Sequence, residues 1–177
     1  ILSAINYRNR TGIGQEIEVD LMSSLLQHQL QEYVAVLNLD QEFKRPESGI
    51  GHPGSGAPFG IYKTKDSFIA IAVAPMEILA EILKDETLKE YAGDSSGAMG
   101  SDLQITKRDE IFNHIENCTK NFLTEDLIDK LFEKDCWCAP LKTHKEVNDD
   151  PQVKHMQMFS SFNHEKYGEV RTVSPPV

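Results

Sequence analysis

The stretch of this sequence best suited to ligand chemistry is rich in glycine. Gly49, Gly51 and Gly54 match the spacing G-x-G-x-x-G, which in dinucleotide-binding proteins joins a strand to the start of a helix. Here residues 45–48 are not strand-like and a predicted strand follows the glycines, so a dinucleotide site is not expected. A kinase-type loop is not expected either, because no Val-Ala-Ile-Lys strand follows. Two interpretations remain: a mobile loop whose backbone N–H groups approach a ligand, and a plain linker between domains.

Cysteine and histidine offer a second kind of chemistry. His114 and Cys118 are four residues apart on a predicted helix, and Cys136 and Cys138 follow, a set that could bind zinc. Cys118 lies within an apolar stripe, however, and C-x-C is not the usual zinc spacing, so we expect core cysteines and no metal. Cys138 lacks a histidine placed to activate it as a nucleophile. The carboxylates are all explained as helix caps or exposed charges.

Composition limits the class of protein. The 177 residues include 40% hydrophobic side chains and carry a net charge of -10, so we expect a folded protein without a nucleic-acid partner. No apolar stretch is long enough to cross a membrane, and no export signal is recognisable. Three cysteines, an odd number, then favour free thiols and a cytoplasmic location, or a mitochondrial or peroxisomal one in a eukaryote.

In the first third of the chain, the pattern predicts a helix that ends near Gly12, a strand over 14–19 and a long helix capped by Asp20. Residues 41–58 are expected to be loop, and a hairpin over 60–63 and 68–73 turns at 64–67. The expected buried face of the long helix consists of Met22, Leu25, Leu26, Leu30, Tyr33, Val34 and Leu37.

Further along, helices are predicted after Pro75, from a Thr106–Asp109 capping box, and over 124–134. Residues 93–101 are expected to form a flexible connection. Short helices follow at a Thr143–Glu146 capping box and at Asp150-Pro151, and a hairpin over 159–173 turns at 166–169. The inward residues of the two longer helices are Ile111, Phe112, Ile115, Cys118 and Phe122, and then Leu127, Leu131 and Phe132. The fold class is therefore α+β and helix-rich.

Several segments, in order, resemble the motifs of family III (CaiB/BaiF-type) CoA-transferases. Residues 10–21 resemble R-T-G-x-G-Q-x-I-D-V-x-L, and His52-Pro53 with residues 57–62 resembles H-P-x-x-A-P-Y-G-x-Y. The strand over 69–73 follows, and a helix-opening motif matches Lys107-Arg108-Asp109. Residues 136–141 resemble a G-V-P-C-G-P-V turn, and residues 146–153 match the start of the next helix.

The resemblance implies a domain organisation. Residues 1–45 belong to a Rossmann-like large domain and its linker helix, and 46–57 form a glycine-rich active-site loop. A small α+β domain spans 58–156, and 157–177 form a hairpin that returns to the large domain. Family members are similar in forming interlocked homodimers, so such a dimer is expected of the full-length protein.

The resemblance also implies an activity: transfer of CoA between carboxylic acids through an aspartyl-CoA thioester. Acyl-CoA and a carboxylate are the substrates, and no permanently bound cofactor is expected. The nucleophilic Asp is expected upstream of Ile1, so this segment alone is expected to be inactive. Its contribution would be the loop of Gly49, Gly51, His52, Gly54 and Gly56, closing over the active site.

Two alternatives stay open. An α-methylacyl-CoA racemase of the same superfamily shares residues 56–59, but it commonly has an acidic residue where Ala74 precedes Pro75, and His52-Pro53 is more similar to the transferases. The other alternative is a non-catalytic binding or assembly module, since no nucleophile is assigned within the segment.

Overall fold

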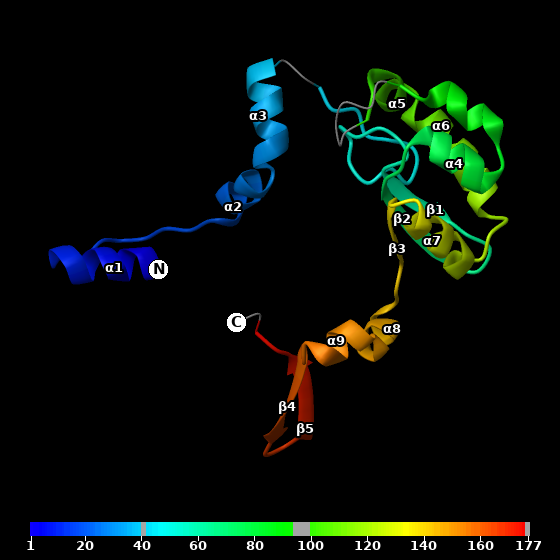
Figure 1. Cartoon of the computed structure of the whole chain (residues 1–177). Helices are drawn as coiled ribbons and strands as arrows, with labels where there is room; N and C mark the ends of the chain where they lie inside the picture. Colours follow the sequence, from blue (N-terminus) through cyan, green and yellow to red (C-terminus); the bar gives the residue numbers. More distant parts are fainter. Residues whose placement is uncertain (40–41, 94–99, 176–177) are drawn as a thin grey trace. The chain divides into compact units, whose positions relative to one another are not determined.

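A computed structural model of the protein describes residues 1–39, 42–93 and 100–175 (Figure 1). Contacts group the chain into two compact units, Ile1–Lys44 and Arg45–Val177. Helices occur together with two small antiparallel sheets, which confirms the predicted α+β class. The finer division into four parts stays a prediction. Within the described ranges, no helix is long and apolar enough to span a membrane.

The first unit begins with α1 (Leu2–Thr11), which ends as predicted. Gly12 takes a left-handed conformation with φ 73°, and its N–H donates to the carbonyl of Arg8. The strand predicted over 14–19 is wrong, because residues 13–20 form no helix or strand. An alternating pattern becomes a strand only beside a partner, and no described segment pairs with these residues.

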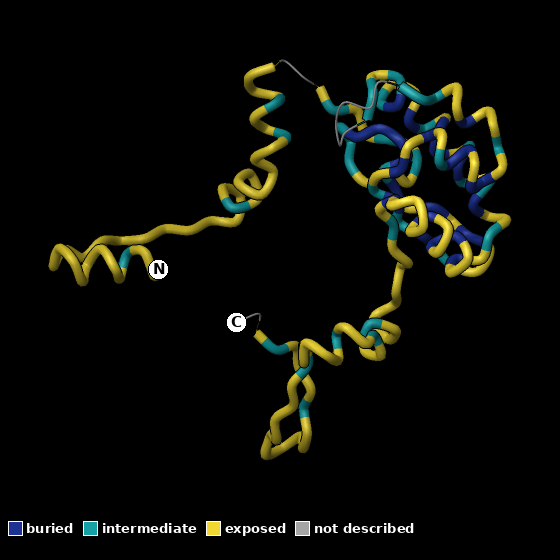
Figure 2. Tube along the Cα trace, viewed as in Figure 1, coloured by how far each residue is buried: buried dark blue, intermediate teal, exposed yellow. Residues whose placement is uncertain are grey.

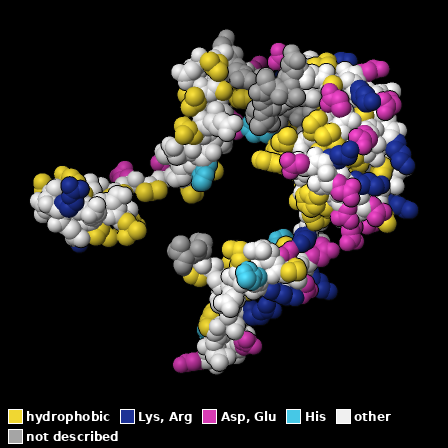
Figure 3. All heavy atoms as spheres, in the orientation of Figure 1, with side chains coloured by type: hydrophobic (Ala, Val, Ile, Leu, Met, Phe, Trp, Pro, Cys, Tyr) yellow, Lys and Arg dark blue, Asp and Glu magenta, His cyan; other side chains and the backbone are white. Residues whose placement is uncertain are grey.

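The predicted long helix is two helices, α2 (Leu21–His28) and α3 (Leu30–Leu39), interrupted at Gln29. Asp20 caps α2 as predicted, since its carboxylate accepts a hydrogen bond of 2.8 Å from the Ser23 N–H. No described residue of this unit is buried (Figure 2). The apolar face that was predicted to be buried is therefore exposed, and apolar side chains lie on the outside of the unit (Figure 3). Periodicity identifies a face that needs covering but not what covers it.

The second unit is built on a three-stranded antiparallel sheet in the order β1-β2-β3. The hairpin of β1 (Gly60–Lys63) and β2 (Phe68–Val73) is confirmed, with Tyr62 opposite Ile69. The third strand, β3 (Trp137–Pro140), pairs with β2, although this segment was predicted only as a turn. We call residues 45–93 and 100–141, which contain this sheet and the helices packed on it, the sheet module.

Five helical segments complete the sheet module: α4 (Met76–Leu83), the 3-10 helix η1 (Glu86–Tyr91), α5 (Asp102–Thr106), α6 (Arg108–Thr119) and α7 (Thr124–Glu133). Helix α6 contacts β1, and α7 contacts β2 and β3. The largest apolar side chains that are almost completely buried are Tyr62, Ile69, Ile71, Met76, Leu79, Leu88, Ile111, Ile115, Leu127 and Leu131. On α7, Ile128 is buried in place of the predicted Phe132, which is 58% exposed.

One predicted cap lies elsewhere. Thr106 belongs to the end of α5, and the capping box forms between Ser101 and Gln104. The Gln104 N–H donates to Ser101 Oγ at 3.3 Å, and the Ser101 N–H donates to Gln104 Oε1 at 2.9 Å. Asp109 does not form the predicted capping box, and its carboxylate accepts hydrogen bonds from Glu47 and Ser48 instead. Of the connection predicted to be flexible, residues 94–99 lie outside the described residues.

The last part of the chain follows the predicted order. Helix α8 (His144–Asp149) begins at the Thr143–Glu146 capping box, and α9 (Pro151–His155) begins at Asp150, whose carboxylate accepts from the Gln152 and Val153 N–H groups. Strands β4 (Phe159–His164) and β5 (Gly168–Val173) form the predicted hairpin, with Phe159 opposite Val173. Its turn lies at residues 165–167 and not at the predicted 166–169, because Gly168 and Glu169 pair with β4.

Asp66 joins the β1–β2 turn to the start of α7. Its carboxylate accepts hydrogen bonds from Thr124 Oγ1 at 2.8 Å and from the Thr124 N–H at 2.9 Å. These bonds hold the pKa of Asp66 below its ordinary value. A carboxyl whose pKa is lowered by folding stabilises the native state above its unfolded pKa of about 3.9, and loses that contribution as the pH falls through the folded pKa.

We therefore expect Asp66→Asn to lower the midpoint of thermal unfolding at neutral pH. Its deficit relative to the wild type should shrink as the pH falls well below about 4. Thermal unfolding of the full-length protein over this pH range measures both effects. Asp129→Asn, altered at an exposed position of α7, supplies the baseline. A deficit that stays the same at every pH would contradict the role assigned to the Asp66 charge.

Candidate functional site

The glycine segment, residues 49–56, is hydrogen-bonded to the edge of the sheet. Ile50 forms an antiparallel bridge with Gly60, the first residue of β1. The Gly51 N–H donates to the Phe59 carbonyl at 3.2 Å, and the Ile61 N–H donates to the Gly49 carbonyl at 3.1 Å. The start of the segment therefore continues the sheet beyond its hairpin.

After this bridge the segment folds into tight turns around His52. The Gly54 N–H donates to His52 Nδ1 at 3.0 Å, and the Ser55 N–H donates to the His52 carbonyl at 3.0 Å. The Phe59 N–H closes the next turn on the Gly56 carbonyl at 3.2 Å. The ring and the carbonyl of half-buried His52 thus fix the backbone of the residues that follow it.

The first turn of α6 holds the segment and the two residues that precede it. Asp109 Oδ1 accepts from the Ser48 N–H at 2.9 Å and from the Glu47 N–H at 3.1 Å. The buried Arg108 guanidinium donates to the Pro53 carbonyl. The sequence singled out Arg108 and Asp109 only as a helix opening. Both contact residues about sixty positions earlier in the chain, and no local sequence pattern predicts such contacts.

Three glycines of the segment, Gly49, Gly51 and Gly56, lie in close packing that leaves no room for a side chain. A Cβ at Gly49 would lie 2.8 Å from both the Ile61 carbonyl oxygen and the Phe112 ring, and one at Gly56 would lie 2.7 Å from the Gln104 carbonyl carbon. A Cβ at Gly51 would lie 2.8 Å from the ring of Phe59. The sequence suggested a mobile loop that approaches a ligand, or a linker, and both stay predictions. The structure adds that Gly49, Gly51 and Gly56 allow close approach to Phe112, Phe59 and Gln104.

A hollow of about 600 Å³ lies against the end of the glycine segment. Its size falls in the range of small-molecule sites, about 300–1,000 Å³. It is lined by Gly56, Ala57, Pro58 and Phe59, by residues 72–77, and by Ala92, Gly93, Gly100, Gln104 and Trp137. Glu77 is the one charged residue among these described lining residues, so the hollow suits an uncharged, largely apolar portion of a ligand.

Cys136 and Cys138 do not have the properties of nucleophiles. Cys136 is buried and Cys138 is half-buried in β3. Burial raises the pKa of both thiols, so both are protonated near neutral pH. A protonated thiol is a poor nucleophile, which supports the structural role expected from the sequence.

The chain belongs to a known enzyme family: the model of CoA-transferase family III matches residues 1–177. It is similar to succinyl-CoA:glutarate CoA-transferase of Homo sapiens, with 26% identity over 178 residues that cover the whole chain and 40% of that protein. Succinyl-CoA:mesaconate CoA-transferase of Haloarcula hispanica is 27% identical over 180 residues, 98% of this chain and 42% of that protein. The chain thus spans about two fifths of these relatives.

Solved structures agree with this assignment. A CaiB/BaiF family protein from Brucella suis superposes with a TM-score of 0.67 at 26% identity, over 99% of this chain and 44% of that one. Rv3272 from M. tuberculosis superposes with a TM-score of 0.69 at 16% identity, which shows the shared fold. The resemblance stated from the sequence motifs is confirmed.

Proposed function

We propose that this chain supplies the small domain and adjoining segments of an enzyme that moves CoA between carboxylic acids. The family match over residues 1–177 carries the proposal. The curated relatives are named for succinyl-CoA as one substrate and for glutarate or mesaconate as the other. Succinyl-CoA and small dicarboxylic acids are therefore the first donor and acceptors to test.

The proposed reaction proceeds through an enzyme carboxylate, an Asp upstream of Ile1. That carboxylate attacks the thioester carbonyl, the C–S bond breaks, and CoA leaves as a thiolate from a mixed anhydride. The thiolate then attacks the enzyme's own carbonyl, which releases the donor acid and forms an aspartyl-CoA thioester. The acceptor carboxylate reverses these steps and leaves as the new acyl-CoA. CoA enters and leaves as part of the substrates, and every bond that forms or breaks in these steps is accounted for without a bound cofactor.

In this proposal the glycine segment forms one wall of the reaction site. A mixed anhydride is easily hydrolysed, so the site must exclude water while keeping hydrogen-bond donors near the developing negative charge. The contacts of the segment with β1, α5 and α6 support a fixed wall. The apolar hollow beside Gly56 and Pro58 is suited to the uncharged part of an acyl or pantetheine chain.

We also propose the interlocked homodimer and a location inside the cell, in the cytoplasm or an organelle matrix. The exposed apolar side chains of α2 and α3 support further protein covering this face. Exposure of apolar side chains over two successive helices is unfavourable, because burying apolar surface stabilises a protein by about 25 cal/mol per Å².

The activity is tested with the full-length protein, succinyl-CoA and a panel of acceptors that includes glutarate and mesaconate. We expect succinate and a new acyl-CoA to appear together in equal amounts, separated by chromatography and identified by mass. Absence of transfer to every acceptor would overturn the proposal. In that case, solvent deuterium entering the α-carbon of a branched acyl-CoA would indicate the racemase, and binding of a protein without either reaction would indicate the assembly module.

A further inference from the structure

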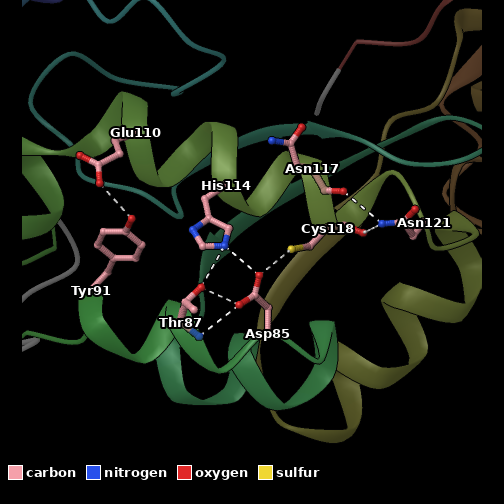
Figure 4. A network of polar contacts seen from close by, with 8 residues as sticks. All are labelled: Asp85, Thr87, Tyr91, Glu110, His114, Asn117, Cys118 and Asn121. Carbon is pink, nitrogen blue, oxygen red and sulfur yellow. Dashed lines mark hydrogen bonds and ion pairs between the residues drawn. The ribbon is translucent and has the colours of Figure 1, made fainter.

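A separate group of side chains lies between η1 and α6, apart from the glycine segment. Asp85 precedes η1, and His114 and Cys118 are one turn apart on the same face of α6 (Figure 4). One ligand atom from each residue lies within 4.8 Å of the other two. A carboxylate, an imidazole and a thiol therefore converge on one point.

The two oxygens of Asp85 have different partners. Oδ1 accepts from Thr87 Oγ1 at 2.6 Å and from the Thr87 N–H at 3.1 Å, which fixes the carboxylate at the start of η1 (Figure 4). Oδ2 faces α6, at 2.8 Å from His114 Nε2 and 3.5 Å from Cys118 Sγ. The oxygen aimed at the cluster is thus oriented by bonds to the other oxygen, as metal-binding carboxylates commonly are.

The imidazole is also held in place. The ring of Tyr91 packs edge-on against His114, with centroids 5.9 Å apart, and the Tyr91 hydroxyl donates to Glu110 at 2.9 Å (Figure 4). His114 and Asp85 each keep about a quarter of their side-chain surface exposed, 27% in both cases. An ion can therefore reach the cluster from solvent while its protein ligands stay oriented.

We propose that Asp85, His114 and Cys118 form a binding site for a divalent transition-metal ion of the zinc type. Zinc binds carboxylate oxygen and imidazole nitrogen at about 2.0–2.2 Å and thiolate sulfur at about 2.3 Å. Ligand atoms around a tetrahedral ion at those lengths are about 3.3–3.7 Å apart. The sulfur–oxygen distance of 3.5 Å already fits, and the nitrogen–oxygen distance of 2.8 Å needs to open by about half an ångström.

Metal binding releases a proton from the thiol. Burial and the Asp85 carboxylate raise the pKa of Cys118 to about 11, so without an ion the sulfur keeps its proton and donates it to Asp85. A bound zinc ion replaces that proton, which leaves to solvent, because a coordinating thiol is deprotonated outright. The ion also needs His114 Nε2 without a hydrogen, so the hydrogen that faces Asp85 Oδ2 leaves Nε2 and the neutral ring carries its proton on Nδ1. Three protein ligands would leave the fourth position of a tetrahedral ion for water or for Thr87 Oγ1, which lies 3.2 Å from His114 Nε2.

From the sequence alone, no metal was expected at these residues. His114 and Cys118 were singled out there, but the downstream pair considered with them was Cys136 and Cys138. The third ligand instead comes from Asp85, 29 residues before His114. The ion would join η1 to the second half of α6, whose first residue, Arg108, donates to the Pro53 carbonyl of the glycine segment.

The test measures zinc binding by the full-length protein after dialysis against a moderate chelator, followed by elemental analysis. We expect one bound ion per chain, and at least about tenfold weaker binding for Cys118→Ser and for His114→Gln, since even outer-sphere changes cost 10–100-fold. Cys138→Ser, altered in β3, is the matched control and should bind like the wild type. Cobalt in place of zinc should give a sulfur-to-metal charge-transfer band that Cys118→Ser lacks and Cys138→Ser keeps.

The cobalt band is measured first in the wild-type protein. This result does not depend on whether the variants fold correctly. Wild-type protein that retains no zinc and gives no thiolate–cobalt band would show that the cluster is only a hydrogen-bonded cap, and would overturn the proposal. Binding that is lost in Cys138→Ser and retained in Cys118→Ser would also overturn it.

Discussion

Gly56→Ala is expected to destabilise the full-length protein by about 1–3 kcal/mol, the usual cost of adding a methyl group to a packed position. The new Cβ would lie 2.7 Å from the carbonyl carbon and 2.9 Å from the carbonyl oxygen of Gln104. These are backbone atoms of α5, and the Gln104 side chain is itself held in a capping box, so they cannot move aside easily. Chemical denaturation measures the change in the free energy of unfolding.

Two other substitutions calibrate this prediction. Asp129→Ala is the control, because Asp129 is exposed on α7, and we expect a change within about 0.5 kcal/mol. Gly51→Ala should be intermediate, since its added Cβ meets only the ring of Phe59, which can rotate. Equal effects at positions 129 and 56 would contradict the packing described for the glycine segment.

Phe112→Ala is expected to cost about 3–5 kcal/mol, the usual range for removing a buried aromatic side chain. Phe112 is 4% exposed and stacks on Tyr62, with ring centroids 4.4 Å apart. Its ring also lies against the backbone of Gly49 and Gly60. The cavity left by the substitution would therefore remove support from β1 and the glycine segment together.

The matched control is Phe132→Ala on α7, where the ring is 58% exposed. Its expected cost is within about 0.5 kcal/mol, as for most surface changes. Denaturation curves of the two variants make the comparison directly. Similar losses at 112 and 132 would show that the core does not lie where the structure places it.

Local signals allowed much of the fold to be predicted. The Asp20 cap, the left-handed Gly12, the Thr143–Glu146 box and the β1–β2 hairpin depend on residues only a few positions apart. Such features are determined by backbone sterics and short-range hydrogen bonds. They form in the structure where the sequence pattern predicts them.

The errors concern features set by distant partners. Strand β3 forms because it can pair with β2. With only four residues, it is too short to show an alternating pattern in the sequence. Asp109 has capping-box spacing from Thr106, but its carboxylate bonds to Glu47 and Ser48 instead. Phe132 lies beside the buried face of α7 and not on it. Ile128 is the residue that joins Leu127 and Leu131 on that face.

The same limit applies to the candidate sites. The glycines could be located from the sequence, but the reason for Gly49 and Gly56 lies in Phe112 and Gln104, which are distant in the chain. Asp85 had no motif connecting it to His114 and Cys118. Spacing reveals ligands that share one helix, whereas the third ligand depends on how η1 packs against α6.

The most direct test of CoA transfer through an enzyme carboxylate follows an oxygen atom. The full-length protein is supplied with succinyl-CoA and a competent acceptor acid, such as glutarate, carrying heavy oxygen in its carboxylates. Each turnover leaves an acceptor oxygen on the enzyme carboxylate, which attacks the next succinyl-CoA. We predict that mass spectrometry finds heavy oxygen in the released succinate. Succinate free of label over many turnovers, with its new oxygen taken from solvent water, would contradict the account.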